Sequence, residues 1–316
     1  MKPAAACGRD DRRDARWDGR SRGGSVGNWI FVTIARKIGL RIAYLLLLPV
    51  AFYYVIFAAK AVKASRSYLW RVGLGGSWLQ RARNSFRHFV QFGKVLLDRV
   101  VVIGGDASRF EFALDGTEHI ESALREGRGV LIISAHVGGW ELAAHVLQRV
   151  NVPVNVVAST DEAPQVRAFF DRVFRDRSFS VISLDGTSAP SFAIMAALAR
   201  GEIVAMHGDR AIGSPTETLP FLGEPARFPR GPHMLAAITG APVVHTFVAR
   251  EGEFRYRFRA YPPEKLACLR RDERERIVTD SIRRFIAHLE ETIRMYPLQW
   301  FNFYDFWQPE GDSRHV

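Results

Sequence analysis

The chain has 316 residues, of which 47% are hydrophobic and 24% are charged, and its formal net charge is +11. The hydrophobic fraction is enough to build a core, and the length predicts one large domain with a short appendage. The two cysteines, Cys7 and Cys268, are far apart in sequence and have no metal-ligand partners nearby, which argues against a disulfide framework or a zinc site. The positive charge suits an acidic partner: anionic lipid headgroups, nucleic acid or an acidic carrier protein.

The N-terminal region divides into a polar part and an apolar part. Residues 1–25 are rich in Arg, Asp and Gly and lack the apolar core of a signal peptide, so we expect a disordered basic tail. Residues 26–66 are predicted to form a membrane-anchor helix, because the 18-residue segment 42–59 is uncharged and has basic residues on both sides. That length is short for a full crossing, so we expect a helix that enters the bilayer without necessarily spanning it. The alternative is a buried N-terminal helix of a soluble domain.

Apolar strand-like segments alternate with amphipathic segments through the rest of the chain, residues 67–316. The predicted strands are 129–134, 153–158, 179–184, 203–207, 242–248 and 254–260. The predicted helices are 140–150, 165–174, 191–200, 232–239 and 277–294. This alternation predicts an α/β fold, an αβα sandwich with a mostly parallel central sheet, preceded by the N-terminal anchor helix.

The first of these strands leads into a segment with candidate catalytic residues. Val130–Ser134 is followed by His136, two glycines, and Glu141 five residues after the histidine. Residues five apart do not share a helix face, so the two side chains are expected on a strand–loop–helix corner, where α/β proteins usually bind ligands. We predict that His136 is a base and Glu141 its orienting partner. The alternative is a capping or core histidine beside a solvated glutamate.

Other polar residues follow later strands. Asp209 and Arg210 come after the strand 203–207, so they too sit at the carboxyl end of a strand, and a surface salt pair is one interpretation of them. A guanidinium at Arg230 can clamp a phosphate, although a solvated loop arginine is the alternative. The basic run of Arg167, Arg172, Arg175 and Arg177 is predicted to be solvated or membrane-facing, and His145, His207, His233 and His245 are predicted to be structural.

Four blocks, in order, resemble the lipid A biosynthesis acyltransferases, the lauroyl and myristoyl transferases of Gram-negative bacteria. The blocks are 135–142 (Ala-His-Val-Gly-Gly-Trp-Glu-Leu), 199–210, 220–244 and 296–300 (Tyr-Pro-Leu-Gln-Trp). The first resembles that family's His-x4-Asp/Glu motif, usually His-Phe-Gly-Asn-Trp-Glu. Two departures, Gly139 in place of Asn and an aromatic tail 300–307 where the family has a basic His-Arg, indicate a divergent branch in which the acceptor lipid differs more than the chemistry.

The resemblance implies a membrane-bound enzyme of the bacterial inner membrane, with its catalytic domain on the cytoplasmic face. It would move a fatty acyl chain from acyl carrier protein or coenzyme A to a hydroxyl of a glycolipid or lipid A-like acceptor. No cofactor, metal or nucleic acid is expected. The roles implied are base for His136, orienting carboxylate for Glu141, oxyanion-binding backbone N–H groups for Gly138 and Gly139, and substrate contacts for Trp140, Asp209, Arg210 and Arg230. The competing readings are a non-catalytic lipid-binding or scaffold protein on the same fold and, third, a hydrolase.

Overall fold

The computed structural model of the chain describes residues 31–307, apart from residues 32, 36, 104–105, 148–149, 160–178, 185–186, 211–214 and 267–269. The predicted tail 1–25, the predicted helix 165–174 with its run of arginines, and the side chain of His145 lie outside the described residues.

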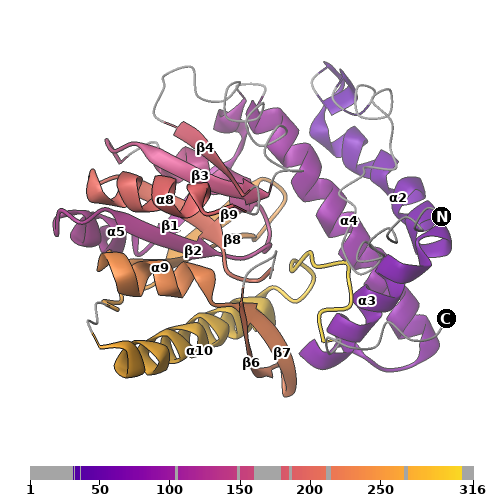
Figure 1. Cartoon of the computed structure of the whole chain (residues 1–316). Helices are drawn as coiled ribbons and strands as arrows, with labels where there is room; N and C mark the ends of the chain where they lie inside the picture. Colours follow the sequence, from indigo (N-terminus) through magenta and orange to yellow (C-terminus); the bar gives the residue numbers. More distant parts are fainter. Residues whose placement is uncertain are drawn as a thin grey trace, which may run out of the picture.

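A seven-stranded sheet forms the centre of the molecule, with strand order β1-β9-β8-β2-β5-β3-β4 (Figure 1). Its strands are β1 (Glu111–Asp115), β2 (Val130–Ser134), β3 (Val154–Ser159), β4 (Phe179–Leu184), β5 (Ile203–His207), β8 (Val243–Arg250) and β9 (Arg255–Ala260). All neighbouring pairs are parallel except β8 and β9, which are antiparallel. The predicted α/β class with a mostly parallel sheet is confirmed. A separate antiparallel hairpin is made by β6 (Thr216–Phe221) and β7 (Glu224–Pro229).

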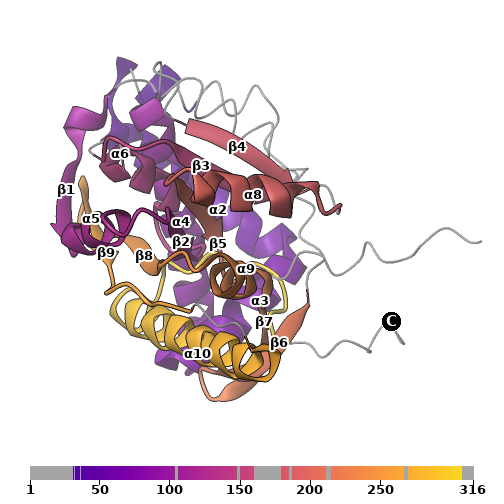
Figure 2. The same cartoon turned by 60° about the vertical axis from the view of Figure 1, so that its left-hand side comes forward.

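Both faces of the sheet are buried, which explains why its central strands are apolar without alternation. In β2, Val130 and Ile132 pack into one hydrophobic cluster, while Leu131 and Ile133 pack into the other. The first cluster also holds side chains of α2 (Leu40–Phe57), α4 (Trp78–Ile103), α5 (Thr117–Leu124) and α6 (Ala143–Leu147). The second holds side chains of α8 (Ala189–Ala199), α9 (Gly231–Thr239) and α10 (Arg271–Met295). The two helical layers make the αβα sandwich seen in Figure 2.

Among the described residues, α2 is the one helix long and apolar enough to cross a membrane. It begins two residues before the uncharged segment 42–59 and therefore includes Arg41. Its inner residues Leu40, Ala43, Tyr44 and Leu47 belong to the same cluster as the sheet, so this helix shares the core of the domain. The chain continues through α3 (Ala59–Leu69) and the short π-helical turn Trp70–Leu74 into α4.

Candidate active site

The sheet register brings the ends of β2 and β5 together. Ser134, the last residue of β2, pairs with His207, the last residue of β5. His136 and Asp209 each follow two residues later, so they leave the same edge of the sheet side by side. This edge is the carboxyl end of the parallel strands, the usual place for a site in an open α/β sheet.

Asp209 is the carboxylate that orients His136. The Nδ1 atom of His136 lies 2.8 Å from Oδ1 of Asp209, and the backbone N–H of His136 donates to Oδ2 at 3.0 Å. The same Oδ2 accepts hydrogen bonds from Trp300 Nε1 and Asn302 Nδ2, each at 2.9 Å. Asp209 is fully buried, yet four donors surround its carboxylate.

These contacts determine the charge of Asp209 and the tautomer of His136. Burial alone would raise the pKa of Asp209, but the positive charge of His136 when its ring is protonated, together with its hydrogen bond, holds that pKa well below its ordinary value. In the neutral ring the single imidazole proton lies on Nδ1 and a lone pair on Nε2, because the ionised carboxylate can only accept. A histidine in this state is prepared to take a proton through Nε2.

The C-terminal segment closes the site from the other side. The backbone N–H of Phe301 donates to the carbonyl of His136 at 2.8 Å, and Val137 forms an isolated bridge with Trp300. His88 of α4 lies between Ser65 Oγ (2.9 Å from Nδ1) and the carbonyl of Trp300 (3.0 Å from Nε2). The C-terminal aromatic segment is thus a source of hydrogen bonds to Asp209. Sequence reasoning missed these roles of Trp300 and Asn302.

Two predicted roles in the His136 loop need correction. The backbone N–H of Gly138 donates to the carbonyl of Gln299 at 2.8 Å, and that of Gly139 donates to the carbonyl of Val248 at 3.0 Å. Both N–H groups are therefore used within the protein and are not available as oxyanion donors. Position 138 requires glycine for a different reason. Its φ is +51°, and a Cβ there would lie 2.1 Å from the carbonyl oxygen of Val248.

Glu141 does not occupy the orienting position predicted for it. Asp209 takes the Nδ1 side of His136, while Nη1 of Arg99 lies 2.8 Å from each carboxylate oxygen of Glu141. Arg99 belongs to α4, so this ion pair ties that helix to the start of the short 3-10 turn Trp140–Leu142. The family motif is present, but its acidic residue, Glu141, stabilises the corner between β2 and the turn. The imidazole of His136 is bound instead by Asp209, the carboxylate that follows β5.

His207, predicted to be structural, lies directly against His136. The two ring centroids are 4.1 Å apart, and His207 Nδ1 lies 3.1 Å from Ser134 Oγ. Burial, followed by the nearby charge of His136, lowers the pKa of His207 well below 6.5, so its ring is neutral. Atoms of His136, His207 and Asp209 have the mutual spacing of metal ligands. Asp209 already accepts four hydrogen bonds, one of them from Nδ1 of His136, so the arrangement as it stands is that of a hydrogen-bonded acid–base pair.

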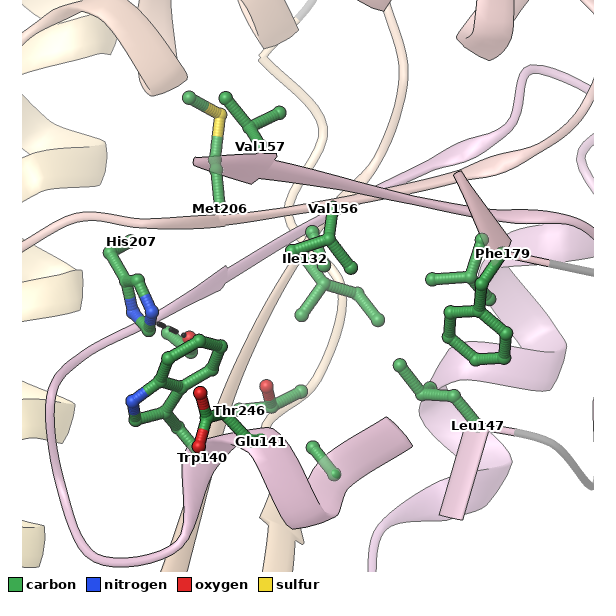
Figure 3. A pocket seen from close by; sticks show the side chains of 14 residues that line it. Ile132, Trp140, Glu141, Leu147, Val156, Val157, Phe179, Met206, His207 and Thr246 are labelled. Atoms are coloured by element: carbon green, nitrogen blue, oxygen red, sulfur yellow. Dashed lines mark hydrogen bonds between the residues drawn. The ribbon is translucent and has the colours of Figure 1, made fainter. Parts of the chain in front are cut away.

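A pocket with an apolar lining begins at His207 (Figure 3). Trp140 stands edge-on to the His207 ring, with centroids 4.5 Å apart. Glu141 and Thr246 lie near this polar end, as Figure 3 shows. The apolar part of the lining comes from Ile132, Ala143, Leu147, Val154, Val156, Val157, Phe179, Ala205 and Met206. A polar end next to His207 and an aliphatic remainder suit a hydrocarbon chain.

The two predicted arginines are held by the protein itself. Arg210 donates from Nε to Asn302 Oδ1 at 2.7 Å and from Nη2 to the carbonyl of Phe301 at 3.3 Å. Arg230 binds the carboxylates of Glu217 and Glu275. These two carboxylates neutralise the charge on which the predicted phosphate clamp depended, so the structure presents Arg230 as a structural ion-pair residue. Contact of Arg210 with a substrate stays a prediction.

Comparison with known proteins gives a family match over residues 83–308, to the bacterial lipid A biosynthesis acyltransferases. The chain belongs to this family. The match begins inside α4 and includes His136, Glu141, Asp209 and the closing segment around Trp300, whereas α2 and α3 precede it.

The curated relatives of this family member are phosphatidylinositol mannoside acyltransferases. That of Mycobacterium tuberculosis (strain ATCC 25618 / H37Rv) is 25% identical over 212 residues, which cover 66% of this chain and 65% of the relative. That of Mycolicibacterium smegmatis is 26% identical over 193 residues, 60% of each chain. The aligned part of this chain therefore spans somewhat less than two thirds of these relatives.

Proposed function

We propose that the protein is a membrane-associated acyltransferase that moves a fatty acyl chain from a thioester to a hydroxyl group of a glycolipid. The observation that carries the proposal is the pair of His136 and Asp209, with Asp209 buried, ionised and hydrogen-bonded by four donors. Family membership and the acyltransferase activity of the relatives support the reaction class. The relatives' acceptor, phosphatidylinositol mannoside, supports a glycolipid as the acceptor here.

In the proposed reaction, Nε2 of His136 removes the proton of the acceptor hydroxyl as its oxygen attacks the thioester carbonyl carbon. Collapse of the tetrahedral intermediate breaks the carbon–sulfur bond, and His136 returns the proton to the departing thiolate. The products are an ester and a free thiol. Asp209 holds the ring through Nδ1–H and stabilises the imidazolium formed between the two steps. The neutral ring of His207, 4.1 Å away, adds no repulsion to that charge.

The pocket beside His207 is proposed to hold the acyl chain. Its interior is aliphatic, and Trp140 stands at the polar end, where the thioester must lie for attack near His136. The donor is proposed to be acyl carrier protein or coenzyme A. Because both are cytoplasmic carriers, the proposal includes a catalytic domain on the cytoplasmic face of the bacterial inner membrane. The reaction as written uses no cofactor or metal.

The test is transfer of a radiolabelled palmitoyl group from its coenzyme A or carrier-protein thioester to phosphatidylinositol mannoside by the purified protein. His136→Ala should lower kcat by about 10²–10⁴-fold, the usual contribution of a general base. The matched control, His119→Ala on α5, should keep kcat within a few-fold. Near-wild-type transfer by folded His136→Ala protein would overturn the mechanism. If the wild-type protein binds the glycolipid but transfers no acyl group from either donor, the result supports the alternative hypothesis of a non-catalytic lipid-binding or scaffold protein.

A further inference from the structure

The outer side of α2 is a large apolar surface. Nine bulky apolar side chains of this helix are at least one-third exposed: Ile42, Leu45, Leu46, Leu48, Val50, Phe52, Tyr53, Ile56 and Phe57. Only 28% of the helix is buried. Contiguous apolar surfaces of this extent are rare on soluble monomers and mark contact sites for protein or lipid.

The inner side of α2 is held along α4 over several turns. Tyr44 donates a hydrogen bond to Asp98, Leu47 packs on Gly93, and the rings of Tyr54 and Phe89 stack with centroids 6.2 Å apart. As the residue number increases along α2, the number of its contact residue on α4 decreases. The two helices are therefore antiparallel neighbours (Figure 1). The helix therefore lies against the domain and does not project from it.

A buried polar cluster fixes this position. Asp98 is fully buried and accepts hydrogen bonds from Tyr44, from Tyr256 Oη at 2.5 Å and from Arg250 Nε at 3.0 Å. Leaving one member of such a cluster unpaired is costly, because Asp98 and Arg250 would remain as desolvated charges. Swinging α2 away from α4 removes Tyr44 and opens the cluster to its surroundings. The docked position is thus the stable one.

Docked in this way, α2 cannot cross a bilayer alone. A crossing would carry the adjacent part of α4, with Arg87, Lys94 and Asp98, to the depth of the hydrocarbon, where each charge is expensive. This cost favours a helix that lies in the plane of the membrane.

The net charge of the chain is concentrated in the part of the sequence that contains this helix. Residues 31–97 contain eleven Lys and Arg residues and no Asp or Glu: Arg36, Lys37, Arg41, Lys60, Lys63, Arg66, Arg71, Arg81, Arg83, Arg87 and Lys94. The other 33 basic residues are matched by the 33 acidic ones, so the whole formal charge of +11 belongs to this segment. Trp70 and Trp78, in the same segment, are 61% and 70% exposed. Basic residues and exposed tryptophans beside an apolar helix face are typical of proteins bound in the interface of anionic membranes.

We propose that α2 lies in one leaflet of an anionic bilayer, its outer face in the hydrocarbon boundary and the basic residues of α3 and early α4 among the headgroups. The occupant of this surface is lipid, and the helix does not span the membrane. Because α4 contacts α2 on one side and ties to Glu141 through Arg99 on the other, the membrane surface is one helix away from the His136 site. The proposal does not depend on acyl transfer, since lipid binding is measured without substrate.

The charge component is tested by flotation of the full-length protein with vesicles of phosphatidylcholine alone or with about 30 mol% phosphatidylglycerol. Replacing Lys60, Lys63 and Arg66 of α3 by Gln should weaken binding to the anionic vesicles roughly 100-fold at low salt, about fivefold for each basic residue. The matched control replaces Arg270, Arg276 and Arg283, exposed residues at or on α10, and should bind like wild type. Equal weakening by both triple variants, or binding indifferent to phosphatidylglycerol, overturns the lipid assignment. The lipid assignment is also overturned if the α3 variant loses binding to acyl carrier protein while its binding to vesicles is unchanged.

The in-plane geometry is tested by labelling single cysteines that flank α2, one before the helix and one after it on α3. In protein with Cys7 and Cys268 changed to Ser, Lys37→Cys and Lys63→Cys should react with a membrane-impermeant maleimide from the same side of sealed vesicles, the side that carries the catalytic domain. A cysteine in place of the exposed Arg276 on α10 marks that side. Labelling of positions 37 and 63 from opposite sides would show that α2 spans the bilayer and refute the proposal, whatever the outcome for acyl transfer.

Discussion

At the scale of single residues, two carboxylates near His136 have separate tasks. Asp209 is fully buried and binds Nδ1 of the imidazole, whereas Glu141 binds Arg99. The negative charge of Asp209 is maintained by its donors, and that charge keeps the proton of His136 on Nδ1. The structure therefore makes opposite predictions for neutralising each carboxylate.

Asp209→Asn should lower kcat by about 10²–10⁴-fold, because an amide at this position can donate to Nδ1 and move the imidazole proton to Nε2, where no base is left. Glu141→Gln removes one charge from a partly buried ion pair and should leave kcat within about tenfold of wild type, with a modest loss of stability. Steady-state kinetics of both variants, with circular dichroism to confirm folding, separate the two. A larger loss in Glu141→Gln than in Asp209→Asn would return the orienting role to Glu141.

At the scale of elements, the corner between β2 and the turn Trp140–Leu142 is built on close backbone contacts. Gly138 forms a bridge with Val248 of β8 and donates its N–H to the carbonyl of Gln299. The side chain of Gln299 in turn pairs with both backbone groups of Arg250, at 2.8 Å and 2.7 Å. The loop that carries His136 is thus fixed to β8 and to the C-terminal segment.

Gly138→Ala should disturb this corner. The Cβ would meet the Val248 carbonyl oxygen at 2.1 Å, so the loop must shift, and φ of +51° is itself strained for alanine. Gly127→Ala is the matched control, because Gly127 also has a positive φ, +73°, but nothing lies within 4 Å of the new methyl group. We expect Gly127→Ala to cost about 1 kcal/mol of unfolding free energy and Gly138→Ala at least about 2–3 kcal/mol, with loss of acyl transfer. Equal shifts in denaturant midpoint would contradict the role of this contact.

The elements also show which parts of the fold and of the site could be predicted from the sequence. The strands β2, β3, β5 and β8 were predictable within a few residues, because strands buried on both faces are largely apolar, and β4 and β9 were predictable from apolar positions interspersed with polar ones. The hairpin β6–β7 and the edge strand β1 were missed, since polar residues interrupt them. The partner of His136 was missed for a different reason: the spacing to Glu141 is local, but Asp209 becomes a neighbour only through the pairing of β2 with β5. Once those two strands are known to be adjacent and parallel, their equal two-residue offsets predict the pair.

At the scale of the whole molecule, several histidines are kept uncharged because they are buried or, for His207 and His288, partly buried. Burial lowers the pKa of each of these from 6.5: His88 to about 4, His233 to about 3, His207 and His245 well below 6.5, and His288 to a lesser extent. In the unfolded chain they take up protons below about pH 6.5. Between that pH and the lowered values the unfolded state binds more protons than the folded state, so stability falls as the pH falls. Asp98 and Glu264, whose pKa values burial raises, act in the opposite direction but are fewer.

The free energy of unfolding should therefore be highest above about pH 6.5 and decrease toward pH 4, by up to roughly 1 kcal/mol per pH unit for each histidine that stays neutral. His88→Gln should reduce this slope, because glutamine does not titrate and its amide can still serve Ser65 and the carbonyl of Trp300. Urea unfolding of the detergent-solubilised protein at several pH values measures both slopes, with His119→Gln, outside the buried set, as the control. If the pH slope of the unfolding free energy is the same for His88→Gln and wild type, His88 takes up its proton in the folded protein as it does in the unfolded chain. The hydrogen bonds of His88, which join α3 and α4 to the segment supporting Asp209, would then have to be reassigned.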